Sequence, residues 1–507
     1  MTISQKILRF VSSITFFWII LGAFLLETVW LALSAKYPMA FDEQYHFGII
    51  KIYAQQWSPI IHHQPAGTSN LGELTYLASY FYHYLMSFPY RFFAVFSHNQ
   101  TFLIIALRLI NVAMFGVGIW FFRQLLLRAK AAPALVNFVL LMLILVPVVP
   151  LLAAEMNYDN LVFMMVPIFL LFFLTVIRHI HQKGELYFSD LAGLIIIGCV
   201  SGIVKYAFLP FIAGGALLIV IYWVMSRHRL RLLKSLAVTF KQLKLWSKIG
   251  LIVALVASMG LFIQRYGTNI AVFHQVDPDC SKVLSVDDCL DYGPWARNYN
   301  RHQHVLAGDY HSSGNFFAFE GNWFGGMIDR LYFTINYDYN TQGPLYVQIW
   351  LVIIAASLGI AFVIIFWRRI HKAHPHLWML LVICGVYVLS LQAVNYHDFI
   401  STAEMVAING RYLILLLPII FVTLAFGYQE FIKAVAGKFY LPVGLIVAAV
   451  LLLLALDGGG IGTYLIYSTD YWYWANDPLT PINRWLHNTL PHFIVGGTKA
   501  VFVEGLK

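Results

Sequence analysis

Long apolar stretches alternate with short polar segments along almost the whole chain. A helix that crosses the hydrocarbon core of a bilayer needs about 20 consecutive apolar residues, and about eleven stretches approach that length. They lie at 13–34, 101–122, 133–153, 161–177, 188–204, 207–225, 249–265, 346–367, 377–394, 412–427 and 440–456. The pattern predicts an all-α polytopic membrane protein with about eleven transmembrane helices, within a range of roughly 10 to 13.

Composition excludes a water-soluble globular enzyme. The 507 residues are 60% hydrophobic and only 11% charged, whereas soluble domains are normally about a quarter charged. The formal net charge of +9 could indicate nucleic-acid binding in a soluble protein, but in a membrane protein it first has to be compared with the topology.

The basic residues are concentrated in the loops that would lie on one side of the membrane. If Lys6 and Arg9 are cytoplasmic, the loops on that side hold more than half of the 33 basic residues and few acidic ones. This is the positive-inside pattern, and it also indicates contact with anionic lipid headgroups. We therefore expect a lipid partner and no nucleic acid, with the N-terminus inside and the C-terminus outside.

This orientation divides the chain into four parts. Residues 1–266 form a transmembrane module that includes outer loop 35–100, and 267–345 form an outer-face insert. Residues 346–456 supply the C-terminal transmembrane helices, and 457–507 form an outer-face tail.

Loop 35–100 is only partly polar. Apolar residues between Ile49 and Ile61 recur at mixed spacings of one, three and four, and aromatic residues are dense between Leu74 and Phe96. Such segments favour amphipathic helices that lie in the membrane interface.

Two adjacent carboxylates, Asp42 and Glu43, stand where the chain leaves the first apolar stretch. They could simply begin a solvated helix, since acidic residues favour the first helical turn. However, an anionic pair beside anionic headgroups is disfavoured unless it handles a cation, a metal or a proton. His46 would share their face on a helix, so a divalent metal ion at these three residues is an open alternative.

Other charged and polar residues lie at the predicted outer ends of spans. Asn157 and Asp159 occupy a short turn, which could be ordinary turn chemistry, while Lys205 and Arg411, followed by Tyr412, sit at span ends. Arg108 lies inside the second span. These cations could snorkel to headgroups or bind an anionic substrate.

The insert contains the only two cysteines that share a polar loop. Cys280 and Cys289 enclose eight residues on the face expected to be oxidising. We expect them to form a local disulfide, on which activity depends only modestly.

The motifs together resemble the GT-C superfamily of membrane glycosyltransferases, especially protein O-mannosyltransferases and lipid A aminoarabinose transferases. The resemblance covers Phe41–Gly48 with its acidic pair, the Arg108-Leu109 start, the Asn157-Tyr158-Asp159 turn, the Lys205-Tyr206 turn and Asn409–Leu413. Residues 1–266 are similar in layout to the module shared by the superfamily, whereas the resemblance does not extend to the insert or the tail.

The resemblance implies transfer of a sugar from a polyprenyl-phosphate donor to a hydroxyl of a glycan, lipid or protein acceptor, with inversion, on the outer face of a bacterial plasma membrane. Asp42 is the expected general base and Glu43 its supporting catalytic residue. The residues expected to bind donor phosphate or substrate are His46, Arg108, Asn157, Asp159, Lys205, Arg411 and Tyr412.

Two other functions remain open. A secondary transporter would also place charges in a helical bundle, but near the bilayer midplane and in paired halves, whereas here they cluster at span ends. A non-catalytic membrane scaffold could use the acidic loops to bind a partner.

Overall fold

A computed structural model describes residues 2–226, 229–311, 314–335, 342–344, 346–458, 473–474, 479–485 and 489. Most of the predicted tail, 457–507, lies outside the described residues, as do short pieces of the insert.

The first half of the chain folds as helices, most of which follow the apolar stretches. They are α1 (Ile3–Val11), α2 (Ile14–Ser34), α3 (Glu43–Tyr53), α4 (Phe81–Ala94), α5 (Gln100–Arg128), α6 (Pro133–Ile144), α7 (Val148–Ala154), α8 (Tyr158–Lys183), α9 (Phe188–Val204), α10 (Leu209–Met225), α11 (Arg229–Gln242) and α12 (Leu245–Phe262). Short turns of helix add η1 (Ser69–Leu71), η2 (Tyr206–Phe208) and η3 (Ile263–Gly267).

The second half begins with the insert and ends with four long helices. Its elements are α13 (Thr268–Phe273), η4 (Cys280–Lys282), α14 (Val286–Leu290), α15 (Gly293–Ala307), α16 (Phe316–Asp329), β1 (Phe333–Ile335), β2 (Gln342–Pro344), α17 (Tyr346–Ala373), α18 (Leu377–Thr402), η5 (Gly410–Leu413), α19 (Leu417–Ala436), η6 (Gly437–Phe439) and α20 (Tyr440–Gly458). The two strands pair antiparallel, with Thr334 opposite Gly343.

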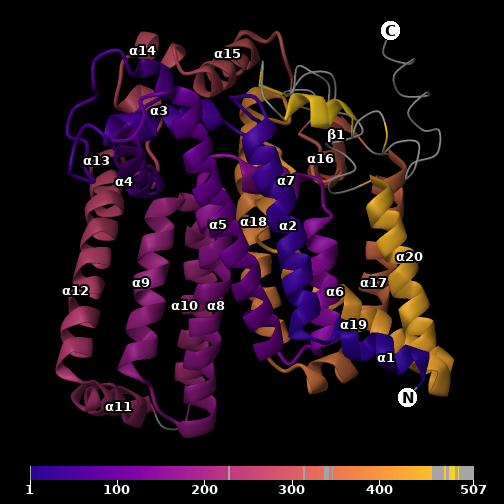
Figure 1. Cartoon of the computed structure of the whole chain (residues 1–507). Helices are drawn as coiled ribbons and strands as arrows, with labels where there is room; N and C mark the ends of the chain where they lie inside the picture. The colour runs from indigo at the N-terminus through magenta and orange to yellow at the C-terminus, as the bar shows by residue number, and fades with distance from the viewer. Residues whose placement is uncertain are drawn as a thin grey trace.

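The prediction of a helical membrane-spanning protein is confirmed. Among the described residues, eight helical stretches are long and apolar enough to cross a bilayer, or nine if α6 and α7, which meet at 74°, form one broken span. All eleven predicted apolar stretches are helical over most of their length, with short breaks at 145–147 and 414–416. Nine is two fewer than the predicted eleven for two reasons. Helix α9 has only 17 residues and is too short to be included, and 417–456 is included as a single stretch. That stretch contains both α19 and α20, and α20 runs back alongside α19 (Figure 1). The number eleven stays a prediction.

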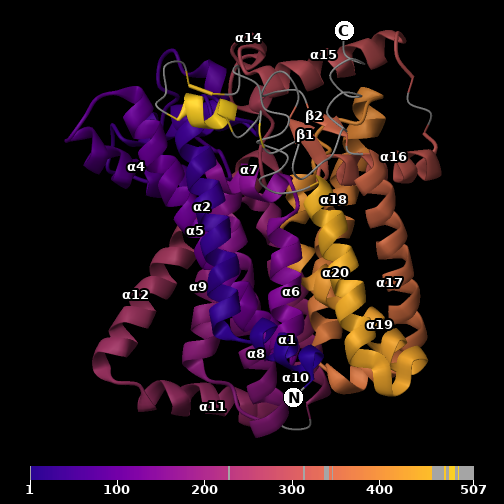
Figure 2. The same cartoon turned by 45° about the vertical axis from the view of Figure 1, so that its right-hand side comes forward.

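The long helices form a bundle with different structures at its two ends (Figures 1 and 2). Helices α3, α4, α14 and α15 lie at one end, which we call the site face. Helices α1 and α11 lie at the other end, the opposite face. Loop 35–100 and the insert therefore share one side of the bundle, as the charge pattern predicts, and the N-terminal helix is on the other.

Loop 35–100 departs from the prediction in the extent of its helices. Helix α3 ends at Tyr53, so the stretch from Trp57 to Ile61 is not helical, and α4 begins only at Phe81. Near the start of the second stretch, Glu73 accepts bonds from the Thr75 hydroxyl and the Tyr76 amide, and such local side-chain bonds compete with helix formation.

Helix α3 is also more buried than an interfacial helix would be. Its buried residues are Glu43, His46, Phe47, Ile49, Ile50 and Tyr53. They pack against α4 and the bundle because their side chains recur on one face at helical spacing. This burial fixes the position of the two residues at its start, Asp42 and Glu43.

Helices α5 and α8 form the central pair beneath the site. The rings of Phe115 and Phe163 stack with centroids 3.9 Å apart, and a Cβ at Gly118 would lie 2.6 Å from the Phe163 ring. The close approach needs glycine at this position. The pair carries Arg108 and Asp159 into the base of the site.

Candidate functional site

The segment between α2 and α3 presents Asp42 at the site face. Phe41 and Asp42 have positive φ angles of 56° and 73°, which cost free energy for residues with a Cβ atom. The Phe41 carbonyl oxygen accepts hydrogen bonds from Arg411 Nη1 at 3.0 Å and Asn157 Nδ2 at 2.9 Å, and these bonds hold the turn. The Asp42 side chain is 47% exposed, and its Oδ2 accepts a bond from Arg411 Nη2 at 3.1 Å.

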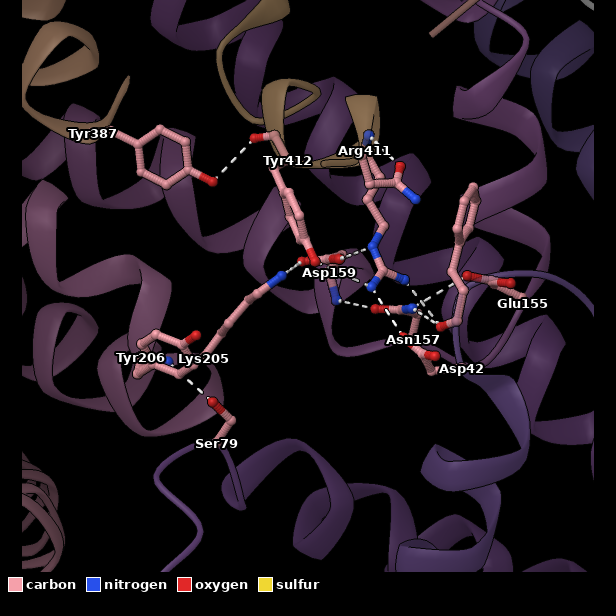
Figure 3. A network of polar contacts seen from close by, with 12 residues as sticks. Asp42, Ser79, Glu155, Asn157, Asp159, Lys205, Tyr206, Tyr387, Arg411 and Tyr412 are labelled. Atoms are coloured by element: carbon pink, nitrogen blue, oxygen red, sulfur yellow. Dashed lines mark hydrogen bonds and ion pairs between the residues drawn. The ribbon is translucent and has the colours of Figure 1, made fainter. Parts of the chain in front are cut away.

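Behind Asp42, two buried cations share one buried carboxylate (Figure 3). Lys205 Nζ lies 2.5 Å from Asp159 Oδ1, and Arg411 Nε lies 3.8 Å from Asp159 Oδ2. The Lys205 ammonium also lies 4.5 Å and 4.7 Å from the ring centroids of Tyr158 and Tyr412. Arg411 Nε and Asp159 Oδ2 lack hydrogen-bond partners among the described residues, so part of the hydrogen-bonding capacity of this cluster is unused.

The charged residues of this cluster lie at helix ends, and two of these ends are capped by asparagine side chains. Asn157 caps α8, and its side-chain oxygen accepts a bond from the Asp159 amide at 2.9 Å. Asn409 does the same for the Arg411 amide at 3.0 Å, at the start of η5. Lys205 directly follows α9. Side-chain caps of this kind satisfy amides that have no partner within a helix.

Gly410 lets η5 approach the end of α16. A Cβ there would lie 2.6 Å from the Met327 carbonyl oxygen and 2.8 Å from that of Arg330. Because backbone atoms cannot give way as a flexible side chain can, the Asn409-Gly410-Arg411 motif needs its glycine to place Arg411.

Glu43 and Arg108 form a fully buried pair one layer deeper. Arg108 Nε and Nη2 donate to the two Glu43 carboxylate oxygens, each at 2.7 Å, and both side chains are 0% exposed. Glu43 also accepts from the Met39 amide at 2.7 Å and the Met156 amide at 3.3 Å. Arg108 Nη1 donates to the Ala35 carbonyl at 2.6 Å. The hydrogen-bonding atoms of both predicted site residues are therefore bonded to each other and to backbone groups.

Glu155 is a buried carboxyl in the same layer. Its Oε1 accepts a bond from Asn157 Nδ2 at 3.2 Å, whereas its Oε2 has no partner among the described residues. Burial, and then the negative charge of Glu43, raise the pKa of Glu155 well above its ordinary value. Its protonated, uncharged form is therefore favoured more strongly than that of an exposed glutamate.

His46 turns away from the two carboxylates. Its Nδ1 lies 2.9 Å from His83 Nε2, so one ring donates to the other, and the ring packs edge-on against Tyr158 with centroids 4.6 Å apart. Burial lowers the pKa of both histidines, that of His83 to about 3; for His46 the neighbouring His83 lowers it further. The pair is neutral and couples α3 to α4.

This histidine pair should make the fold sensitive to acid. An unfolded histidine binds its proton with a pKa near 6.5, whereas folded His83 does so near 3. Between these values the unfolded state binds more protons, so the free energy of unfolding is fully retained above about pH 6.5 and falls as the pH is lowered towards 3. We expect the thermal unfolding midpoint in detergent to fall between about pH 7 and pH 5. The decrease should be smaller in His83→Gln, and an unchanged pH dependence in that variant would contradict the assignment.

The divalent-metal alternative gains no support from the ligand geometry. Asp42, Glu43 and His46 face Arg411, Arg108 and His83 instead of one common point. Over the described part of the chain, no group of three or more His, Cys, Asp or Glu residues is arranged to hold a metal ion.

The insert packs over the first loop beside Asp42. Cys280 and Cys289 are joined in a disulfide, and the Tyr292 amide donates to the Cys289 carbonyl at 3.1 Å. The Tyr292 ring meets Tyr45 edge-on with centroids 5.1 Å apart. The disulfide thus lies three residues from an aromatic side chain at the rim of the site.

The structure brings most of the sequence-predicted residues together. The cluster around the shared carboxylate contains Asp42, Asn157, Asp159, Lys205, Arg411 and Tyr412. Glu43 and Arg108 form the layer beneath it, and His46 borders it through Tyr158.

Sequence reasoning did not select Glu155, His83 or Asn111. Asn111 Oδ1 accepts from the Tyr82 hydroxyl at 2.9 Å and from Asn160 Nδ2 at 3.1 Å, which ties α4 to α8. The position of Glu155 could have indicated a functional role, because a carboxyl that closely follows a long apolar stretch is costly to bury. His83 carried none, since its partner lies 37 positions away.

The cluster combines two buried cations that can bind an anion with one carboxylate that reaches solvent. This arrangement can stabilise a negative charge on one molecule and accept a proton from another. No protein-family model matches this chain, and no curated protein sequence matches it either.

Proposed function

We propose that this protein is a GT-C-type membrane glycosyltransferase that moves a sugar from a polyprenyl-phosphate donor to an acceptor hydroxyl. The observation that carries the proposal is the position of Asp42. It is a half-exposed carboxylate paired with Arg411, which shares the buried carboxylate of Asp159 with a second cation, Lys205.

The donor phosphate would bind at Arg411 and Lys205. In the free protein the charges of these two residues are balanced by Asp42 and Asp159. Asp42 is the exposed partner and accepts a bond from Arg411 Nη2, whereas Asp159 is buried between both cations. A phosphate at Arg411 would therefore displace Asp42 first, and the cations would remain together through Asp159.

The displaced Asp42 would then serve as general base. It accepts the proton of the acceptor hydroxyl while that oxygen forms a bond to the anomeric carbon of the sugar. The bond between that carbon and the phosphate oxygen breaks, and its electron pair leaves with the polyprenyl phosphate. Arg411 and Lys205 stabilise the charge that develops there. Direct displacement inverts the anomeric configuration.

Glu43 and Arg108 support this chemistry as positioning residues. Their bidentate bond, and the bond that Glu43 accepts from the Met39 amide, hold the segment that carries Asp42. Asn157 adds a bond to the Phe41 carbonyl. We assign Glu43 this role in place of a catalytic one because both of its oxygens are occupied.

The same proposal includes the finer topology. Eleven crossings put the N-terminus and α11 on the cytoplasmic side of a bacterial plasma membrane and the site face outside, where polyprenyl-linked sugars and their glycan, lipid or protein acceptors meet. The relative placement of loop 35–100, the insert and α1 supports this arrangement.

The test is release of sugar from the carrier. Membranes that contain the protein are incubated with radiolabelled polyprenyl-phosphate sugars, and label that leaves the lipid fraction is counted. We expect release with wild type and a loss of about 100-fold in Arg411→Ala, because removal of one preorganised donor to a developing oxyanion costs that much. Arg411→Lys should keep part of the activity, since the charge remains while the planar geometry is lost.

Arg297→Ala is the matched control, because it removes an exposed arginine from the site face and should leave release unchanged. Equal release by Arg411→Ala and wild type would refute phosphate binding at Arg411. If wild-type protein in proteoliposomes took up a labelled solute in unmodified form and released no sugar from the carrier, the result would instead favour the secondary transporter.

A further inference from the structure

Helix α11 lies across the bundle at the opposite face, between the ends of α10 and α12 (Figures 1 and 2). Its orientation is fixed by side-chain bonds to the start of α9. Ser235 Oγ accepts from the Leu186 amide at 2.7 Å, and Thr239 Oγ1 accepts from the Phe188 amide at 3.1 Å. The face of α11 that carries Ser235 and Thr239 therefore packs against the rest of the protein.

The rest of α11 combines exposed apolar and basic side chains. Leu230 is 73% exposed, Leu233 is 50% exposed and Val238 is 54% exposed. Trp246, just beyond the helix, is 82% exposed. In a soluble protein this exposure would be costly, but an apolar stripe with tryptophan at a helix end is typical of membrane-interface segments.

Six basic residues accompany this apolar stripe. Four lie in α11 and two follow it, namely Arg229, Arg231, Lys234, Lys241, Lys244 and Lys248. The sequence from 229 to 262 contains no acidic residue. Among the described residues, the one ion pair of this group is the exposed contact of Arg231 with Glu185 at 3.5 Å. At 100° per residue, Lys234 and Lys241 lie next to the stripe formed by Leu230 and Leu233.

Helix α1 repeats the arrangement on the same face. Ile3, Ile7 and Phe10 are 78%, 44% and 51% exposed, and their spacing places them on one side of the helix. Lys6 and Arg9 belong to the same short helix. Two separate helices with exposed apolar and basic side chains thus lie at the same end of the bundle (Figure 1).

We propose that α11 is an in-plane helix that binds anionic phospholipid headgroups on the membrane face opposite the candidate site. The exposed leucines enter the acyl boundary, and the lysines and arginines contact the headgroup phosphates. A phospholipid surface fits better than nucleic acid because the charges adjoin an apolar stripe at the ends of membrane-spanning helices. The inference does not depend on the glycosyltransferase proposal.

The experiment measures lipid selectivity of the full-length protein. Purified protein in neutral detergent is mixed with equal amounts of phosphatidylglycerol and phosphatidylcholine, and bound lipids are counted by native mass spectrometry. We expect wild type to prefer phosphatidylglycerol. Arg229→Gln/Arg231→Gln/Lys234→Gln/Lys241→Gln should lower that preference by about tenfold or more, since each basic residue near an anionic surface contributes several-fold in affinity.

The matched control exchanges the same four residues for the other basic residue (Arg→Lys, Lys→Arg) and should keep the preference. A milder Lys234→Gln/Lys241→Gln variant tests the idea if the quadruple variant unfolds. An unchanged preference in the neutralised variants would overturn the proposal. So would a preference lost in Arg411→Ala but kept in the α11 variants, because the anionic lipid would then bind at the candidate site.

Discussion

Asp42→Asn should lower sugar transfer by about 100-fold or more while the protein stays folded and still binds the donor lipid. Asparagine keeps the shape of the side chain and removes its ability to accept a proton. The Asp42 side chain is half exposed, and Arg411 is the one ion-pair partner of its carboxylate among the described residues, so loss of its charge should cost little stability. Turnover and donor binding are measured separately, by release of label and by retention of labelled lipid on the purified protein.

Asp287→Asn provides the matched control. Asp287 is an exposed carboxylate in the insert, at the same face of the bundle, and its loss should leave transfer unchanged. Normal turnover by Asp42→Asn would remove the general base from the proposal. If Glu43→Gln were then inactive in a folded protein, the roles of the two carboxylates would be exchanged.

Arg108→Met should destabilise the fold by about 3–5 kcal/mol, because it leaves the Glu43 carboxylate buried without its cation. Glu43 keeps two backbone amide donors, from Met39 and Met156, but these do not neutralise its charge. We expect a clear fall in the thermal unfolding midpoint in detergent, together with loss of transfer as the Asp42 segment loosens.

The double variant Glu43→Gln/Arg108→Met separates charge from packing. It removes both charges and should recover much of the lost stability, since replacement of a whole buried ion pair is often nearly neutral. Arg297→Met, at an exposed position, should leave the midpoint unchanged. A midpoint equal to wild type in Arg108→Met would show that the pair does not hold this part of the protein.

The sequence by itself determined the helical class and that loop 35–100 and the insert lie at the same end of the bundle. Within a bilayer, backbone amides and carbonyls must be bonded inside their own helix. The length of an apolar stretch therefore predicts a spanning helix without knowledge of the helices that pack against it. Sidedness follows from the order of the spans, which is why loop 35–100 and the insert were placed together correctly. Span ends interrupted by charged residues, such as Lys205 and Arg411, also pointed to the polar cluster.

The tertiary structure alone decided which partner each charge has. Glu43 and Arg108 are 65 positions apart, and nothing local distinguishes an arginine that binds substrate from one that neutralises a buried glutamate. The same holds for His46, which faces His83 instead of the acidic pair, and for Glu155, whose pKa burial raises. These outcomes depend on how α3, α4, α5 and α8 pack, because burial and the nearest opposite charge are set by residues from other helices. Asp42 and Glu43 are neighbours in sequence, yet packing leaves one exposed and encloses the other.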